Sequence, residues 1–322
     1  MSEMNRRSFL KRVAGAGALI AVSELPSFGE DMPEIFPNRG RRERMSISYG
    51  VVHIGLEKPF SVLHISDSHL TEAFPHENDK KQQLKKKRTQ TFGGMQEAAL
   101  AEALAWAKKH TDYVVHTGDL IDWQSEANFE LARKYLGDGI MAAPGNHEFS
   151  PDMNLSEPKI EHNEDFKDTL RPMLKTQCPY DISFASQVVN GVNFITFEDV
   201  FGYVTEDQVA KFKQEAEKGL PMVLCMHVPF FTEDLWRMRC RFWVDKGQMQ
   251  NGDFPAPRGD YKAQLDDALT RDFIQWLKEL PLLKCILTGH EHVTMEDQFS
   301  PTCREYVVGG GFLFNAREVL FL

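Results

Sequence analysis

Five short apolar runs in the sequence are each followed at once by side chains that can bind metal ions. The runs are Phe60–Ile65, Tyr113–Val115, Ile140–Ala143, Met222–Met226 and Lys284–Leu287. The polar side chains that follow them are, in chain order, Asp67, His69, Asp119, Asp122, Asn146, His147, His227, His290 and His292. Borderline divalent metals favour such mixtures of imidazole and carboxylate donors. Three Asp or Asn residues with four His residues already exceed the ligands that one ion needs, so the set predicts two ions.

The apolar runs are predicted to be buried β-strands that carry these side chains to one place. Helical patterns lie between several of them, at Met95–Lys109, at Thr205–Lys218 and at Arg271–Leu280. The alternation predicts an α/β fold. Ligands bind beyond the carboxyl ends of strands in such sheets, so we expect the five runs to deliver their polar residues to one rim.

Two shorter patterns predict local structure. Thr205 and Gln208 have the spacing of a capping box at the start of the second helix. The runs Ile182–Val188 and Val192–Phe197 are joined at Asn190-Gly191. This dipeptide favours a type I′ turn, so the two runs predict a β-hairpin.

Composition excludes several classes of protein. The 322 residues are 42% hydrophobic and 26% charged, which is typical of a soluble globular protein with a large core. No run approaches the ~18 apolar residues of a membrane span, so no transmembrane anchor is expected. The net charge is −10. Such an acidic chain is a poor general binder of DNA or RNA. Five cysteines without CxxC spacing argue against a disulfide framework and leave one bridge open.

The N-terminus has the pattern of an export signal. Arg6 and Arg7 precede Ser-Phe-Leu-Lys, and a mild apolar stretch runs from Val13 to Val22. This pattern resembles the twin-arginine signal, so residues 1–29 are predicted as a signal peptide and residues 30–45 as a linker. We therefore expect the twin-arginine translocase to export the folded protein to the periplasm or the medium. A basic tail without a targeting function is the alternative.

Taken together, the five blocks of polar residues resemble the calcineurin-like metallophosphoesterase superfamily. The resemblance covers residues 60–292, and it is carried by Asp67-Ser68-His69, Gly118-Asp119-Leu120-Ile121-Asp122, Gly145-Asn146-His147-Glu148, His227 and Gly289-His290-Glu291-His292. It implies an α/β fold in which two mixed β-sheets pack as a sandwich flanked by helices. The corresponding domain is expected to comprise residues 46–322.

The resemblance also implies a role for each residue of the blocks. A first metal ion would be bound by Asp67, His69 and His292. A second would be bound by Asn146, His227 and His290, with Asp119 bridging the two ions. The family's catalytic histidine corresponds to His147, and the carboxylate that orients it corresponds to Asp122. With these residues the protein is expected to hydrolyse phosphate ester bonds with a water that two metal ions activate.

One departure narrows the choice of metal. Purple acid phosphatases within the superfamily have a tyrosine that ligates ferric iron where this chain has Asp122. The absence of this tyrosine argues against a ferric site. Manganese, ferrous iron and zinc stay open as the metal ions. The phosphorylated substrate is not identified, and phosphomonoesterase and phosphodiesterase activity both stay open. A catalytically silent protein-binding scaffold on the same fold is the alternative of another class, which the presence of His147 with all seven ligand positions disfavours.

Three further segments bear on the substrate or on packing. Residues 229–261 are long and aromatic, which predicts an inserted lid. The basic run Lys80–Arg88 is interpreted as a solvated helix face, with steering of an anionic substrate as the alternative. In Arg237–Arg241 the arginines alternate with apolar residues, which on a strand would form one cationic face for a substrate phosphate. Cys225 and Cys285 lie in strand runs and are expected to be buried and inert.

Overall fold

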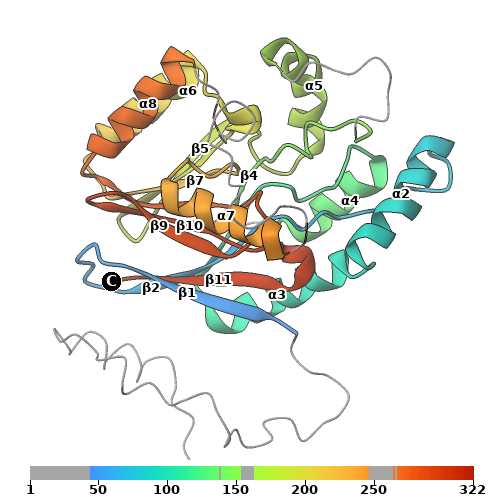
Figure 1. Cartoon of the computed structure of the whole chain (residues 1–322), viewed down its shortest axis with the longest axis horizontal. Coiled ribbons are helices and arrows are strands. Elements are labelled where there is room, and N and C mark those ends of the chain that lie inside the picture. Colours follow the sequence, from blue (N-terminus) through green and yellow to red (C-terminus); the bar gives the residue numbers. More distant parts are fainter. Residues whose placement is uncertain (1–43, 138, 154–162, 246, 248–263, 265–266) are drawn as a thin grey trace, which may run out of the picture.

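The computed structural model describes residues 44–137, 139–153, 163–245, 247, 264 and 267–322 (Figure 1). Its centre is formed by two mixed β-sheets, as the resemblance to the metallophosphoesterases implies. The predicted signal peptide lies outside the described residues, as do nearly all of the predicted linker and nearly half of the predicted lid. No described helix is long and apolar enough to cross a membrane.

The first sheet has five strands in the order β1-β11-β2-β3-β4. Their bounds are Ser46–Val52 for β1, Phe60–Ile65 for β2, Tyr113–Thr117 for β3, Ile140–Ala143 for β4 and Asn315–Phe321 for β11. The strands β2, β3 and β4 run parallel, and β11 pairs antiparallel with β2 and parallel with β1. Every residue of β2 is buried, which explains why its sequence reads as a continuous apolar run.

The second sheet has six strands in the order β5-β6-β7-β8-β10-β9. Their bounds are Phe184–Val189 for β5, Val192–Phe197 for β6, Met222–Cys225 for β7, Leu283–Thr288 for β8, Met295–Ser300 for β9 and Cys303–Val307 for β10. The four central strands are parallel, and β5 and β9 close the two edges as antiparallel partners. The predicted hairpin is confirmed as β5 and β6, with positive φ at both Asn190 and Gly191.

The two sheets pack face to face around an apolar core, which confirms the predicted sandwich. Phe60 of β2 stacks on Phe321 of β11, with ring centroids 5.0 Å apart. Phe194 of β6 meets the Phe321 ring edge-on at 5.4 Å. Cys225 and Cys285 are buried in this same core, and burial raises the pKa of both thiols. All five cysteines are free thiols, so the one bridge that the sequence left open does not form.

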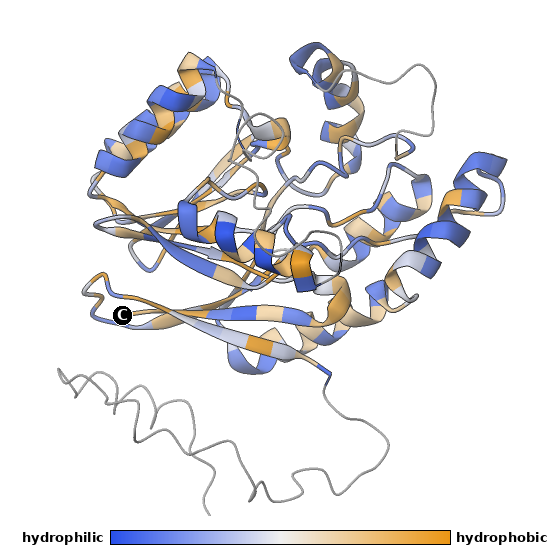
Figure 2. Ribbon diagram, viewed as in Figure 1, coloured by the Kyte–Doolittle hydropathy of each residue, from blue (hydrophilic) through white to orange (hydrophobic). Residues whose placement is uncertain are grey.

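Seven described helices flank the two sheets (Figure 1). They are α2 (Asp79–Phe92), α3 (Gln96–His110), α4 (Glu126–Tyr135), α5 (Glu164–Gln177), α6 (Glu206–Ala216), α7 (Glu233–Asp245) and α8 (Ala268–Glu279), with short 3₁₀ turns η2 (Val200–Gly202) and η4 (Gly311–Leu313). Apolar residues of α3 and α4 pack on the first sheet, and those of α6 and α8 pack on the second. In contrast, α2 is hydrophilic along most of its length, and Leu84 is its one fully buried residue (Figure 2).

The segment Arg237–Arg241 is part of helix α7, so the cationic strand face considered from the sequence is wrong. The Oγ1 atom of Thr232 accepts a hydrogen bond from the backbone N–H of Leu235, and the first turn is acidic. Both features favour a helix start. Leu235 packs with Met295 of β9, which fixes the apolar side of α7 against the second sheet. The arginines are therefore spread around a helix.

Candidate dimetal centre

The predicted site residues lie where the two sheets meet, directly after the strands that the sequence indicated. The first sheet contributes residues from the loops after β2, β3 and β4, and the second from those after β7 and β8. Asp67, His69, Asp119 and His227 are buried, whereas His147, His290 and His292 are partly exposed. The loops bring together all nine residues that the sequence singled out.

Asp67, His69 and His292 form the first group of donor atoms. The Nε2 atoms of His69 and His292 face each other at 3.0 Å. The Oδ1 atom of Asp67 lies 3.3 Å from His292 Nε2 and 3.9 Å from His69 Nε2. Thus one carboxylate and two imidazoles converge on one point.

Asn146, His227, His290 and Asp119 form the second group. The Oδ1 atom of Asn146 lies 3.2 Å from His227 Nε2 and 3.1 Å from His290 Nδ1. These two ring nitrogens are 3.2 Å apart, and Asp119 Oδ2 is 3.3 Å from His227 Nε2. The same Asp119 oxygen lies 3.8 Å from His69 Nε2 of the first group. Asp119 therefore stands between the two groups.

These separations fit two metal ions. Two donors that each lie ~2.1 Å from a shared ion, at octahedral to tetrahedral angles, are about 3.0–3.4 Å apart. Six of the donor pairs above lie at 3.0–3.3 Å. In the described part of the chain, the ion pairs of the buried Asp67 and Asp119 carboxylates are made with histidines alone. Bound cations would compensate the two buried charges.

The backbone at the site is held in an unusual conformation. The residues with positive φ include Asp67 at 52°, His69 at 47°, Asp119 at 53°, His290 at 66° and His292 at 56°. Non-glycine residues adopt this left-handed region rarely, and each instance costs of order 1–3 kcal/mol. The site thus concentrates backbone strain at five of its predicted metal ligands.

Gly145 and Gly289 have no side chain, and the carboxylates of Asp119 and Asp67 lie where a side chain would be. A Cβ atom on Gly145 would lie 2.3 Å from Asp119 Oδ1, and one on Gly289 would lie 2.5 Å from Asp67 Oδ2. Both distances are far below van der Waals contact. Any larger residue at either position would therefore displace a carboxylate of the centre.

Hydrogen bonds on the far side of the rings set their orientation. The Nδ1 atom of His227 lies 2.7 Å from the carbonyl oxygen of Thr117, and the Nδ1 atom of His69 lies 3.1 Å from Asp122 Oδ1. Each acceptor favours a proton on Nδ1. The Nε2 atom is then left as the metal-binding atom in both rings.

His147 lies beside the donors with one side open to solvent. Its Nδ1 atom is 2.7 Å from the backbone oxygen of Asp122 and 2.9 Å from that residue's Oδ1, and its Nε2 atom is 3.7 Å from Asp119 Oδ2. Burial alone would lower the pKa of His147, but the Asp119 and Asp122 carboxylates outweigh it and raise the pKa to about 9. The geometry therefore suits a protonated ring that faces the centre.

Glu148 is a structural part of the site whose role the sequence did not reveal. Its buried carboxylate accepts hydrogen bonds from four backbone N–H groups, those of Asp119, Leu120, Ile121 and Gly145. The loops after β3 and β4 are thereby tied together. Its position after Gly-Asn-His was visible, but the sequence does not show that its partners are backbone atoms.

A cleft of about 250 Å³ opens beside the centre. His147, Asn146 and His290 line one part of it, and the remaining lining includes the apolar side chains of Phe149, Met153, Phe201 and Val228. The cleft therefore combines the donor groups with an apolar wall.

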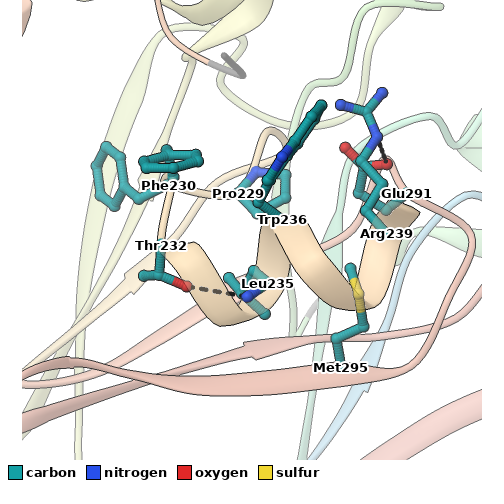
Figure 3. Close-up of a pocket in the computed structure, with 9 residues that line it drawn as sticks. Pro229, Phe230, Thr232, Leu235, Trp236, Arg239, Glu291 and Met295 are labelled. Atoms are coloured by element: carbon teal, nitrogen blue, oxygen red, sulfur yellow. Dashed lines mark hydrogen bonds and ion pairs between the residues drawn. The ribbon is translucent and has the colours of Figure 1, made fainter. Parts of the chain in front are cut away.

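Helix α7 is tied to the loop that carries two of the predicted ligands (Figure 3). The Nε atom of Arg239 lies 2.7 Å from Glu291 Oε2, and Glu291 stands between His290 and His292. A small neighbouring pocket of about 30 Å³ is lined by residues including Trp236 and Met295. Arg237 instead pairs with Glu233 and Asp234 on the exposed side of α7.

Two groups of side chains able to bind metal ions, with one carboxylate between them, fit the donor arrangement of a two-metal hydrolytic centre. The family model for calcineurin-like phosphoesterases matches residues 60–294, which is well over half of the chain. The chain belongs to this family. Comparison of the sequence with curated proteins gives no significant match.

Solved structures that resemble this chain include several phosphatases. A dimetal phosphatase from Danio rerio is 14% identical, with 79% of this chain and 88% of that chain covered and a TM-score of 0.41. A purple acid phosphatase from yellow lupin seeds is also 14% identical, with coverages of 80% and 45% and a TM-score of 0.42. The calcineurin-like phosphoesterase YfkN from Bacillus subtilis is 11% identical, with coverages of 79% and 82% and a TM-score of 0.38.

Proposed function

We propose that this protein hydrolyses phosphate esters at a centre of two divalent metal ions. The observation that carries the proposal is the pair of donor groups that share Asp119, with His147 beside them. Asp67, His69 and His292 would hold one ion, and Asn146, His227 and His290 the other. Manganese, ferrous iron and zinc all suit this set of nitrogen and oxygen donors. The aspartate at position 122 disfavours ferric iron, because it supplies no phenolate.

Bound at these two groups, the ions would lower the pKa of a shared water and compensate the charge of the phosphoryl oxygens. The chain's own residues then have separate tasks. Asp119 holds the two groups at a fixed separation through its shared carboxylate. His147 donates a proton to the leaving oxygen, or stabilises its negative charge, from the open side of the site. Asp122 keeps the Nδ1 face of His147 occupied, so that Nε2 points toward the reacting group.

The cleft suits an ester with an apolar organic group. Phe149, Phe201 and Val228 would contact that group while the phosphoryl group lies at the donors. An aryl phosphate is therefore a suitable first substrate. The same centre can serve monoesters and diesters, so the choice between these two reactions is left to experiment.

The test is a panel of aryl phosphate monoesters, diesters and nucleotides assayed with metal-free protein reconstituted with one metal at a time. We expect chelation to abolish hydrolysis, and manganese or a similar divalent ion to restore it. Undiminished activity in rigorously metal-free protein would contradict the proposal. A protein that binds two ions and hydrolyses none of the panel would favour the scaffold alternative.

We also propose that the protein is exported through the twin-arginine translocase. The support is the Arg6-Arg7-Ser8-Phe9-Leu10-Lys11 motif and the mild apolar stretch that follows it. A route that carries folded proteins would allow the metal ions to bind before export.

A further inference from the structure

Helix α2 reaches the candidate metal centre with two side chains, although its sequence reads as a solvated basic helix. Arg88 and Phe92 are four residues apart, which places them on one face of the helix. Lys80, Lys81 and Lys85 of the same helix instead pair with acidic groups away from the centre, namely Asp152, Glu77 and Glu72. The basic run is thus divided between surface ion pairs and one residue at the centre.

Arg88 makes a bidentate pair with Asp122. Its Nε atom donates to Asp122 Oδ2 at 2.5 Å, and its Nη2 atom donates to Oδ1 at 2.7 Å. The Asp122 side chain is fully buried, and the Arg88 side chain is 18% exposed. This contact is therefore more shielded than those of Lys80, Lys81 and Lys85, whose side chains are 27–39% exposed. Two parallel hydrogen bonds to a planar guanidinium fix both the position and the plane of the carboxylate.

The fixed carboxylate in turn meets two rings of the centre. Asp122 Oδ1 lies 3.1 Å from Nδ1 of His69, a predicted ligand, and 2.9 Å from Nδ1 of His147, the predicted catalytic residue. The two rings meet edge to face, with centroids 4.5 Å apart. A rotation of the Asp122 carboxylate would therefore disturb both rings together. Arg88 is the group that prevents this rotation.

Phe92 supports the same ring from its face. It stacks on His69 with centroids 4.6 Å apart and an interplanar angle of 17°. The guanidinium of Arg88 lies 4.6 Å from the centre of the Phe92 ring, so the two α2 residues also support each other. His69 is thereby held at its edge through Asp122 and at its face by Phe92.

We propose that α2 is the positioning element of the first metal site, with Arg88 locking the Asp122 carboxylate and Phe92 stacking on His69. Both are positioning residues that act through other side chains. The inference rests on the dimetal centre of the proposed function, and it assigns to Arg88 a task other than steering an anionic substrate. It predicts that Arg88 determines how tightly the ion at Asp67, His69 and His292 is held.

The experiment compares the metal-loaded wild type with Arg88→Gln, Arg88→Lys, Phe92→Leu and the control Lys87→Gln, which alters an exposed residue of the same helix. Each protein is dialysed against graded concentrations of a chelator, and the manganese or zinc that remains is counted per chain. The kcat and KM for an aryl phosphate and the melting temperature are measured on the same samples. Because metal retention needs no substrate, this arm is independent of the proposed activity.

We expect Arg88→Gln to lose one equivalent of metal at a 10- to 100-fold lower chelator concentration than the wild type, as is typical when a partner of a metal ligand is removed. Its kcat should fall while KM changes less than about threefold. Arg88→Lys should be intermediate, because an ammonium group cannot reproduce the two-pronged contact. Phe92→Leu should weaken retention of the same ion, and Lys87→Gln should match the wild type.

Three outcomes would overturn the inference. Full metal retention in Arg88→Gln with a raised KM alone would make Arg88 a substrate contact. A lowered melting temperature with unchanged metal retention and kcat would make the pair merely structural. Loss of retention in Lys87→Gln as well would point to the charge of the helix rather than to Arg88.

If Arg88→Gln does not fold, Arg88→Lys and Phe92→Leu decide the question. A wild type that holds two ions but hydrolyses nothing would instead refute the proposed function alone.

Discussion

Asp119 is the residue on which the charge of the candidate centre depends most, because its Oδ2 atom lies within 4 Å of donors in both groups. We predict that Asp119→Asn loses metal occupancy. The asparagine amide lacks the negative charge that would lie between two cations. On one side it presents N–H hydrogens in place of an oxygen that could bind an ion. Metal analysis of the purified variant is the measurement, and full occupancy of both sites would refute the bridging role.

His147 also offers a donor atom near His69 and Asp119, but the resemblance assigns it the catalytic role, and its side chain faces the cleft. We predict that His147→Gln keeps both metal ions but lowers kcat by ~10²-fold or more, the scale of a general acid's contribution. Metal analysis and turnover of an aryl phosphate are measured on one preparation. Near-normal turnover with both ions bound would remove His147 from the reaction, and loss of one ion would make it a ligand.

Some of the site could be predicted from the residues alone, and some could not. The predicted ligands stand directly after apolar strands, so their convergence follows from strand order. Glu148 was visible beside Asn146 and His147, but its partners are backbone N–H groups, which every residue except proline carries. Arg88 was hidden in a run of similar charges, since nothing local distinguishes the one cation that reaches Asp122.

At the scale of elements, strands that are buried along all or nearly all of their length were the most predictable. The bounds of β2, β4 and β6 match the apolar runs. Helix α7 was misjudged because alternation over Arg237–Arg241 mimics a strand for five residues, whereas the decisive start signals lie earlier, at Thr232 and Glu233. The position of β11 between β1 and β2 depends on long-range pairing, which no local pattern encodes.

Glu305 of β10 joins two other elements at the second sheet. Its Oε1 atom accepts from the backbone N–H of Phe230, after β7, and from Thr288 Oγ1 at the end of β8. Burial and the nearby carboxylates of Asp199 and Asp297 raise the pKa of Glu305 to about 8, although its hydrogen bonds oppose this. In the described structure its Oε2 atom has no hydrogen-bond partner.

This shift predicts a pH-dependent stability. Between its ordinary pKa of 4.5 and about 8, the folded protein holds a proton on Glu305 that the unfolded chain has released. Rising pH therefore lowers the free energy of unfolding, by at most ~1.4 kcal/mol per pH unit from this group. We predict that Glu305→Gln, neutral throughout, matches the wild type near pH 5 and becomes more stable than it near pH 8. Urea unfolding at several pH values is the measurement, and parallel curves for the two proteins would contradict the assignment.

At the scale of the whole molecule, the candidate centre joins the two sheets. Asn146 follows β4 of the first sheet, whereas His227 and His290 follow strands of the second. An ion bound by all three would cross-link the halves of the sandwich. Binding to the folded state alone also stabilises that state by mass action.

The proposed export through the twin-arginine translocase concerns the whole molecule and depends on Arg6 and Arg7. We predict that replacing both Arg6 and Arg7 by Lys keeps the protein in the cytoplasm, folded and active. Lysine preserves the charge, so only a receptor that recognises the planar guanidinium pair should reject the variant. Cell fractionation is the measurement, with Lys11→Arg as the control that leaves the pair intact. Equal periplasmic recovery of the double variant and the wild type would contradict the twin-arginine route and leave the metal centre unaffected.

The place of β11 has a consequence for synthesis on the ribosome. β11 separates β1 from β2 in the first sheet, yet it is translated after every other described strand. A nascent chain therefore exposes β2, and the following loop that carries Asp67 and His69, before β11 has been synthesised. Until then the edge of β2 that pairs with β11 has no partner strand. The first sheet can close only once Phe321 has left the exit tunnel. In that interval the edge of β2 that later pairs with β11 is open to pairing with another strand.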